Sequence, residues 1–133
     1  MKTDITCIVC PNGCALHVEQ SGGSIVVSGN MCMRGKDFAV AEITAPMRTI
    51  CSTVRTLFKD VPVLPVRVSS DIPKGKIFDV MREINKITVT EKIGTGETVI
   101  KNVCNLGVDV IATSNVLCGY GDEYGAGKAA MKL

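Results

Sequence analysis

Cysteines are the residues of this sequence best suited to chemistry. The segment CIVCPNGCALHV, residues 7–18, contains three cysteines, and Cys32 follows after 17 intervening residues. Four thiolates can enclose Zn²⁺ in a tetrahedral shell or bind the four irons of a [4Fe–4S] cluster. Zinc ribbons usually carry two C-x2-C pairs, whereas three close cysteines and one remote cysteine are more typical of an iron–sulfur site. We therefore expect a metal centre, a [4Fe–4S] cluster with zinc as the alternative, at Cys7, Cys10, Cys14 and Cys32.

The residues around these cysteines suit a metal site. Pro11 and Gly13 favour a turn between the second and third ligands. Arg34 and Lys36 could stabilise thiolate or cluster charge beside Cys32, or they could be solvated charges on a short helix. A different alternative is a reversible dithiol formed by Cys7 and Cys10, although the βαβ pattern of thioredoxin-like proteins is absent.

The other cysteines and the histidine are weaker candidates for metal binding or catalysis. Cys51 reads as a small buried residue of a strand, with a spare metal ligand as the alternative, and Cys104 and Cys118 read as structural or functionless thiols. His17, the one histidine, alternates away from the apolar face and is expected at the surface. With no second histidine and no phosphate-binding loop, we predict no catalytic residues and no catalysis by this chain alone.

A β-hairpin is expected to bring the cysteines together. Residues 3–9 are predicted to form a strand, and ALHVEQ and SIVVSG a hairpin around residues 20–23. The predicted register pairs Val18 with Ile25 and Leu16 with Val27, which places Cys14 opposite Gly29. Cys32 then lies within reach of the other three thiols. A short helix over residues 34–43 should follow and end before Pro46.

The remaining sequence predicts a second unit. The prolines in residues 60–65 fit a linker or an edge strand and not a central strand. Residues 66–70 read as a strand, Asp71 as a helix N-cap, and residues 74–86 as a helix with an apolar stripe. That stripe comprises Ile77, Val80, Met81 and Ile84. Further strands are predicted within residues 87–93, 97–103 and 108–116.

These elements predict an α+β fold in two parts. A cysteine-rich metal-binding head with a β-hairpin occupies residues 1–58. An α+β unit, one main helix packed on a small and mostly antiparallel sheet, occupies residues 62–117. A glycine-rich flexible tail is expected over residues 118–133.

The composition of the chain is that of a globular protein and argues against some classes of partner. The chain has 133 residues, 46% hydrophobic and 21% charged, with a net charge of +2 and no basic run. This balance is typical of a globular protein and argues against nucleic acid as the main partner. We expect no signal peptide, no membrane span and a cytoplasmic location, where the odd number of cysteines would stay reduced.

The N-terminal part resembles a known iron–sulfur domain. CIVCPNGCALHV followed by GNMCMRGKDFAVAEITAPMR is similar to the N-terminal [4Fe–4S] domain of molybdopterin oxidoreductases. The likeness covers roughly residues 5–50. The gap before Cys32 is shorter than is usual there, and 133 residues leave no room for molybdopterin-binding domains. Molybdenum chemistry is therefore not expected.

The whole sequence resembles a family of small, uncharacterised CXXC-motif proteins of anaerobic bacteria and archaea, thought to bind metal through four cysteines. LPVRVSSDIPKGKIFDVM and GTGETVIKNVCNLGVDVIATSNV also carry this resemblance. It implies a partner, either an FAD-dependent dehydrogenase resembling the anaerobic glycerol-3-phosphate type or an NAD(P)/FAD-dependent oxidoreductase. The expected function is an accessory electron-transfer subunit, with a zinc-stabilised interaction module and a small dithiol oxidoreductase as alternatives.

Overall fold

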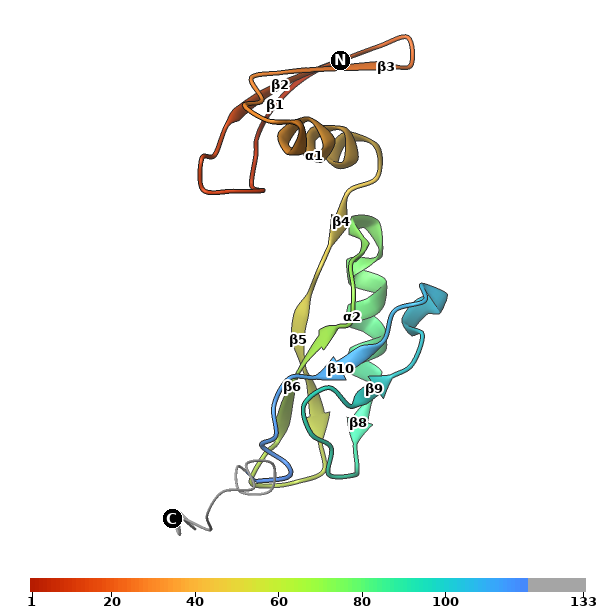
Figure 1. Cartoon of the computed structure of the whole chain (residues 1–133). Coiled ribbons are helices and arrows are strands. Elements are labelled where there is room, and N and C mark those ends of the chain that lie inside the picture. Colours follow the sequence, from red (N-terminus) through yellow and green to blue (C-terminus); the bar gives the residue numbers. More distant parts are fainter. Residues whose placement is uncertain (120–133) are drawn as a thin grey trace. The chain divides into compact units, whose positions relative to one another are not determined.

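Two units, each with its own apolar core, make up the chain in a computed structural model that describes residues 1–119. The N-terminal unit comprises residues 1–47, and the C-terminal unit begins at Arg48. Both combine helices with strands, so the predicted α+β class is confirmed (Figure 1). The predicted tail, residues 118–133, lies outside the described residues from position 120 onward.

The N-terminal unit consists of a three-stranded antiparallel sheet in the order β1-β2-β3 and one helix. Its elements are β1 (Lys2–Thr6), β2 (Ala15–Ser21), β3 (Ser24–Ser28) and α1 (Met33–Thr44). Leu16 and Val18 are buried on one face of β2 and pack with Ala39 of the helix. The predicted hairpin and the predicted helix are therefore both present.

The predicted register of the hairpin is wrong by two residues. Val18 pairs with Val27, and Gln20 with Ile25, so the loop contains only Gly22 and Gly23. Both glycines have positive φ, +58° and +85°, as the tightest hairpin turns require. A two-residue shift leaves every side chain on its original face, so apolar alternation could not reveal the error. Extended beyond β3, this register places Cys14 opposite Met31 and not opposite Gly29.

The C-terminal unit is built on a five-stranded sheet in the order β8-β5-β6-β10-β9. Only the β5–β8 pair is parallel, so the predicted mostly antiparallel sheet is confirmed. The strands are β5 (Cys51–Thr56), β6 (Val63–Val68), β8 (Thr88–Val89), β9 (Thr98–Ile100) and β10 (Val110–Ala112). The two-residue strands β4 (Met47–Arg48) and β7 (Ile72–Pro73) pair separately.

Pro65 lies in a central strand, contrary to the predicted linker over residues 60–65. It belongs to β6, which pairs with β5 on one side and β10 on the other. The N–H of Thr113 donates to the Pro65 carbonyl (N···O 3.0 Å), just past the last residue of β10. In an antiparallel sheet, the N and the C=O of one residue point toward the same neighbouring strand. The nitrogen of Pro65 therefore points toward β10, at a position just beyond the last residue of that strand. The missing N–H therefore interrupts no ladder bond.

The predicted boundary near residue 60 consequently falls inside one sheet. β5 precedes that boundary and β6 follows it, yet the two strands pair over their length from Cys51–Arg67 to Arg55–Val63. The two units instead divide between Met47 and Arg48.

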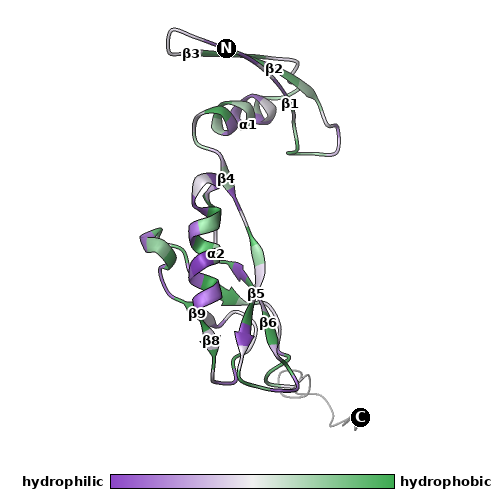
Figure 2. Cartoon of the chain, turned by 180° about the vertical axis from the view of Figure 1, so that it is seen from behind, coloured by the Kyte–Doolittle hydropathy of each residue, from purple (hydrophilic) through white to green (hydrophobic). Residues whose placement is uncertain are grey.

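Helix α2 (Ile77–Lys86) follows a single 3₁₀ turn, η1 (Lys74–Lys76). Val80 and Ile84 are buried, and Ile77 and Met81 pack at the edge of the same core, which confirms the predicted stripe. Figure 2 shows hydrophilic and hydrophobic residues alternating along this helix. Asp71 is not its N-cap, because β7 intervenes; the Asp71 carboxylate instead accepts a hydrogen bond from the Thr49 hydroxyl.

The strands predicted after α2 are present but shorter than expected. β8, β9 and β10 each contain only two or three residues and are joined by the longer connections 90–97 and 101–109. The second 3₁₀ turn, η2 (Val103–Asn105), contains left-handed backbone at Cys104. Across residues 1–119 we find no helix with the length and apolar character needed to cross a bilayer.

Candidate metal centre

The loop between β1 and β2 carries the first three motif cysteines. The N–H of Cys7 donates to the Cys14 carbonyl (N···O 2.9 Å), so the ends of this loop are held together. Within it, the Gly13 N–H approaches the Cys10 carbonyl at 3.4 Å, and Gly13 has φ +57°. The predicted turn between the second and third cysteines is therefore present, with Pro11 in its first central position.

Gly29 holds the chain leading to Cys32 against the start of β2. A Cβ atom at this position would lie 2.1 Å from the carbonyl oxygen of Ala15, where no side chain fits. Its φ of +84° is also one that L-residues rarely adopt. This close approach fixes where the chain leaves β3 toward Cys32.

Cys32 is the N-cap residue of α1 and is exposed. Its carbonyl accepts hydrogen bonds from the Gly35 N–H (3.2 Å) and the Asn30 side-chain amide (3.1 Å). The N–H of Gly35, the Arg34 side chain and the Arg34 N–H together lower the pKa of the Cys32 thiol, because they stabilise the thiolate. The thiol makes no hydrogen bond of its own to cap the helix.

Cys7 also lies against the first turn of α1. Its side chain is buried, and its Sγ lies 3.6 Å from the point where a Cβ of Gly35 would stand. Gly35 is itself buried, so its lack of a side chain leaves room for the sulfur between α1 and the sheet. The first and the last motif cysteines therefore adjoin one helical turn.

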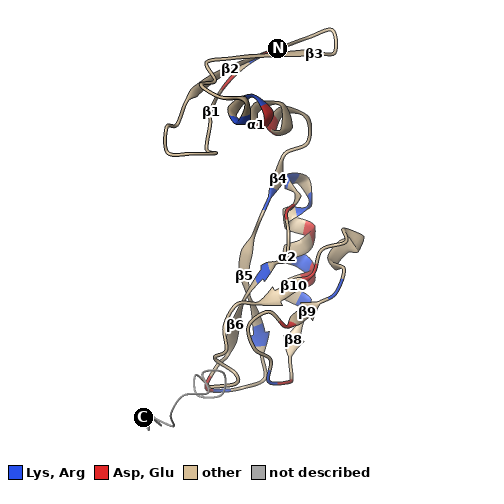
Figure 3. Ribbon diagram, viewed as in Figure 1, with Lys and Arg blue, Asp and Glu red and all other residues tan. Residues whose placement is uncertain are grey.

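The first turn of α1 has an unusual charge pattern. It contains Arg34 and Lys36 and no acidic residue. The N-terminus of a helix carries a partial positive charge, so each cation there is unfavourable by about 0.3–1 kcal/mol unless negative charge is nearby. In Figure 3 these cations mark the start of α1, while the neighbouring cysteine loop has no charged residue. Thiolates, or a cluster bound to them, would supply the missing negative charge.

The positions of the four thiols only partly suit a metal. Cys10 and Cys14 are half-buried, and Cys14 packs with Cys7 in the core of the N-terminal unit. In the part of the chain that the structure describes, however, no three side chains of cysteine, histidine, aspartate or glutamate converge to hold one ion. Four thiolates are suitable ligands for Zn²⁺ or a [4Fe–4S] cluster, and binding of either by all four cysteines would require the cysteine loop or the first turn of α1 to move.

The remaining cysteines and His17 lie elsewhere. Cys51 is exposed, contrary to the predicted burial, because it points away from the face of β5 that Val54 buries. Cys104 and Cys118 are half-buried, and Cys104 packs against the core of the C-terminal unit. His17 is exposed as predicted, and its Nδ1 lies 2.8 Å from the Asp4 carboxylate across the β1–β2 pair.

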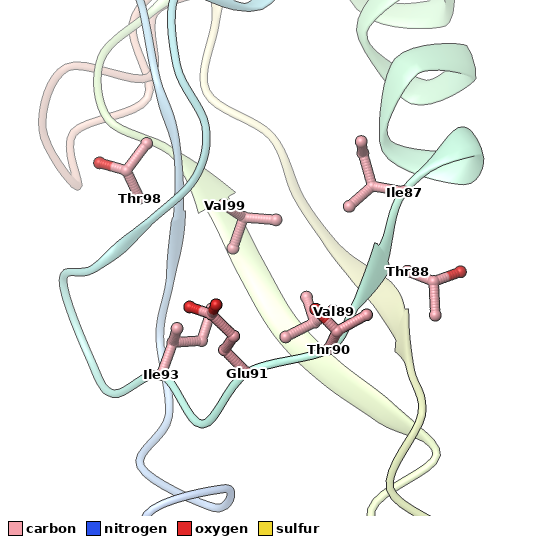
Figure 4. A pocket seen from close by; sticks show the side chains of 8 residues that line it. All are labelled: Ile87, Thr88, Val89, Thr90, Glu91, Ile93, Thr98 and Val99. Atoms are coloured by element: carbon pink, nitrogen blue, oxygen red, sulfur yellow. The ribbon is translucent and has the colours of Figure 1, made fainter.

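The C-terminal unit has a small surface hollow. It is open to solvent, has a volume of about 180 Å³, and is smaller than the 300–1,000 Å³ typical of ligand pockets. Figure 4 shows its lining of threonine and aliphatic side chains, with Glu91 as the one charged group. Its lining residues are Ile87, Thr88, Val89, Thr90, Glu91, Ile93, Thr98 and Val99.

Comparison with protein families gives a match over residues 33–114, to a family described as "Protein of unknown function (DUF1667)". The chain belongs to this family. The match covers α1 and the described strands from β4 to β10, and begins directly after Cys32. The four motif cysteines thus precede the matched residues, and the family description names neither activity nor ligand.

The chain is also similar to a solved structure, the NMR structure of Clostridium perfringens protein CPE0013. The two sequences are 30% identical, with a TM-score of 0.48, over 52% of this chain and 82% of that chain. Comparison with the curated proteins found no match.

Proposed function

We propose that this DUF1667 protein is an accessory electron-transfer subunit that binds a [4Fe–4S] cluster through Cys7, Cys10, Cys14 and Cys32. The main support is that Cys7 and Cys32, which are far apart in the sequence, both lie at the first turn of α1. A bound cluster supplies a one-electron carrier. The chain's own residues supply thiolates, the Gly35 and Arg34 N–H groups, and the nearby cations Arg34 and Lys36.

The proposed electron donor is an FAD-dependent dehydrogenase resembling the anaerobic glycerol-3-phosphate type, or an NAD(P)/FAD-dependent oxidoreductase. The support is the resemblance to small CXXC-motif proteins described above. Outer-sphere transfer needs a centre near the surface and no acid–base group, and Cys32 is exposed. A cytoplasmic location is part of this proposal, because a cluster and its thiolates persist under reducing conditions.

Anaerobic reconstitution with iron and sulfide tests the proposed metal centre. We expect about four irons and four sulfides per chain, a broad visible absorbance, and an EPR signal after reduction. Cys32→Ala should abolish the intact cluster, whereas Cys51→Ala, which removes an exposed cysteine of the other unit, should leave it unchanged.

Two other outcomes would replace the proposal. One zinc per chain without sulfide would identify the site as a structural zinc module, for which the same four thiolates are suitable ligands. No metal together with a reversible Cys7–Cys10 disulfide would identify a dithiol oxidoreductase, and Cys14 and Cys32 would then be dispensable for redox cycling.

A further inference from the structure

Large apolar side chains flank the motif cysteines and are exposed. Ile8 and Val9 separate Cys7 from Cys10, and Met31 and Met33 stand on either side of Cys32. Their exposed fractions are 77% for Ile8, 43% for Val9, 79% for Met31 and 63% for Met33. Scattered exposed apolar residues are common, but the clustering of four beside one candidate site needs an explanation.

Both apolar pairs belong to the same end of the N-terminal unit. The Cys7–Cys14 hydrogen bond closes the loop that contains Ile8 and Val9, and Cys7 packs against Gly35 in the first turn of α1. Met31 and Met33 flank the residue that starts this helix. Figure 1 shows the loop after β1 and the start of α1 at one end of the unit.

The charged residues that follow these side chains in the sequence are basic. The sequence has no charged residue from Ile5 to Leu16 or from Gln20 to Met33. The next charged side chains are Arg34 and Lys36, both exposed, and Asp37 is the first acidic residue of α1. An apolar surface with a basic edge is complementary to an apolar surface with an acidic edge.

We propose that this end of the N-terminal unit docks a partner protein whose apolar contact surface is bordered by carboxylates. The docking surface, here called the cysteine-end patch, consists of Ile8, Val9, Met31, Met33, Arg34 and Lys36. The proposal rests on the proposed metal centre, because a partner bound here covers the cysteines and meets the redox group directly.

A protein is favoured over a lipid surface by the composition of the patch. Trp and Tyr dominate membrane interfaces, and the patch contains neither, whereas methionine is enriched in protein interfaces and adapts to their shape. The patch is small, so binding should be weak and sensitive to salt, as in transient electron-transfer encounters.

The experiment uses the full chain after anaerobic reconstitution and a purified, reduced FAD-dependent dehydrogenase as the probe. One reduced flavin holds two electrons and reduces two copies of the chain by one electron each. Stopped-flow absorbance gives the rate of cluster reduction by the dehydrogenase and, separately, by reduced methyl viologen, which needs no docking surface.

Met31→Ser/Met33→Ser should slow reduction by the dehydrogenase by about tenfold, with reduction by viologen changed by less than about twofold. Val26→Ser, at a residue of β3 that is 61% exposed, is the matched control and should have no effect. Raising salt from about 50 to about 300 mM should slow the wild type, and Lys36→Gln should weaken that dependence.

Equal rates for the double variant and the wild type would overturn the docking proposal. Binding to anionic lipid vesicles that is lost in the double variant would also overturn it, in favour of a membrane surface. Failure to take up iron would refute the proposed function instead and would appear before any kinetic measurement. The docking proposal would then be decided by calorimetry of the dehydrogenase with the unreconstituted protein and the same variants.

Discussion

Substitution of Gly29 tests whether the close approach to Ala15 positions the cysteines. Gly23→Ala is a matched control, because the two glycines have nearly equal φ, +84° and +85°, and a Cβ at Gly23 would meet nothing within 4 Å. Each alanine incurs about 1–2 kcal/mol for adopting positive φ. In Gly29→Ala, the new Cβ would lie 2.1 Å from the Ala15 carbonyl oxygen, and this distance must grow beyond 3.0 Å. The start of β2 is therefore displaced.

We expect this displacement to add about 2 kcal/mol or more to the destabilisation by Gly29→Ala, as for other strained or overpacked sites. Hydrogen exchange followed by mass spectrometry should show this difference as a loss of protection in β2 and β3 roughly 30-fold greater than in Gly23→Ala. The thiol of Cys7, which is 5% exposed in the wild type, should also react faster with alkylating agents in Gly29→Ala.

The C-terminal unit serves as the internal reference, because exchange in its sheet should be the same in both variants. Equal loss of protection in Gly29→Ala and Gly23→Ala would refute the reasoning, since backbone conformation alone would then account for both effects. Unchanged protection in Gly29→Ala would show that the contact with Ala15 does not fix the path to Cys32.

Two further predictions concern the core and the thiols. Ile84 is 2% exposed, and Ile84→Ala should lower the free energy of unfolding by about 2–5 kcal/mol in urea titrations. Phe78, on the same helix, is 76% exposed, and Phe78→Ala should change that free energy by less than about 0.5 kcal/mol. Equal effects of the two substitutions would contradict the assigned faces of α2. Since a lowered pKa raises the thiolate fraction at a given pH, alkylation of Cys32 should reach half its maximal rate at a pH below the ordinary thiol pKa of about 8.5. Arg34→Gln should move that midpoint upward only in part, because the Gly35 N–H remains; a Cys32 midpoint at or above the ordinary thiol pKa would contradict this prediction.

Local patterns in the sequence predicted most of the elements. The Ile77-to-Ile84 stripe predicted α2 and its buried face, since helical spacing alone puts those side chains on one side. The same periodicity argument could have placed Cys51 correctly. It lies three residues from Val54, so the alternation of a strand directs the two side chains to opposite faces.

Long-range pairing decided what local patterns could not. Asp71 and Pro73 have the chemistry of a helix start, but pairing of β7 with β4 makes that segment a strand first. Pro65 is tolerated in the central strand β6 because β10 ends beside it, a fact that depends on a strand far along the chain. The exposure of Met31 and Met33 likewise depends on the tertiary structure, because sequence alone would assign methionine to a core.

The amino-acid sequence by itself determined the four-cysteine motif, the hairpin, both helices and the α+β class, because these follow from residue type and from periodicity over a few neighbours. The tertiary structure decided the hairpin register, through the two-glycine turn, and the placement of Cys7 against Gly35 in the first turn of α1, which Cys32 caps. Both depend on how closely two backbone segments approach, and that distance is set by packing and turn geometry.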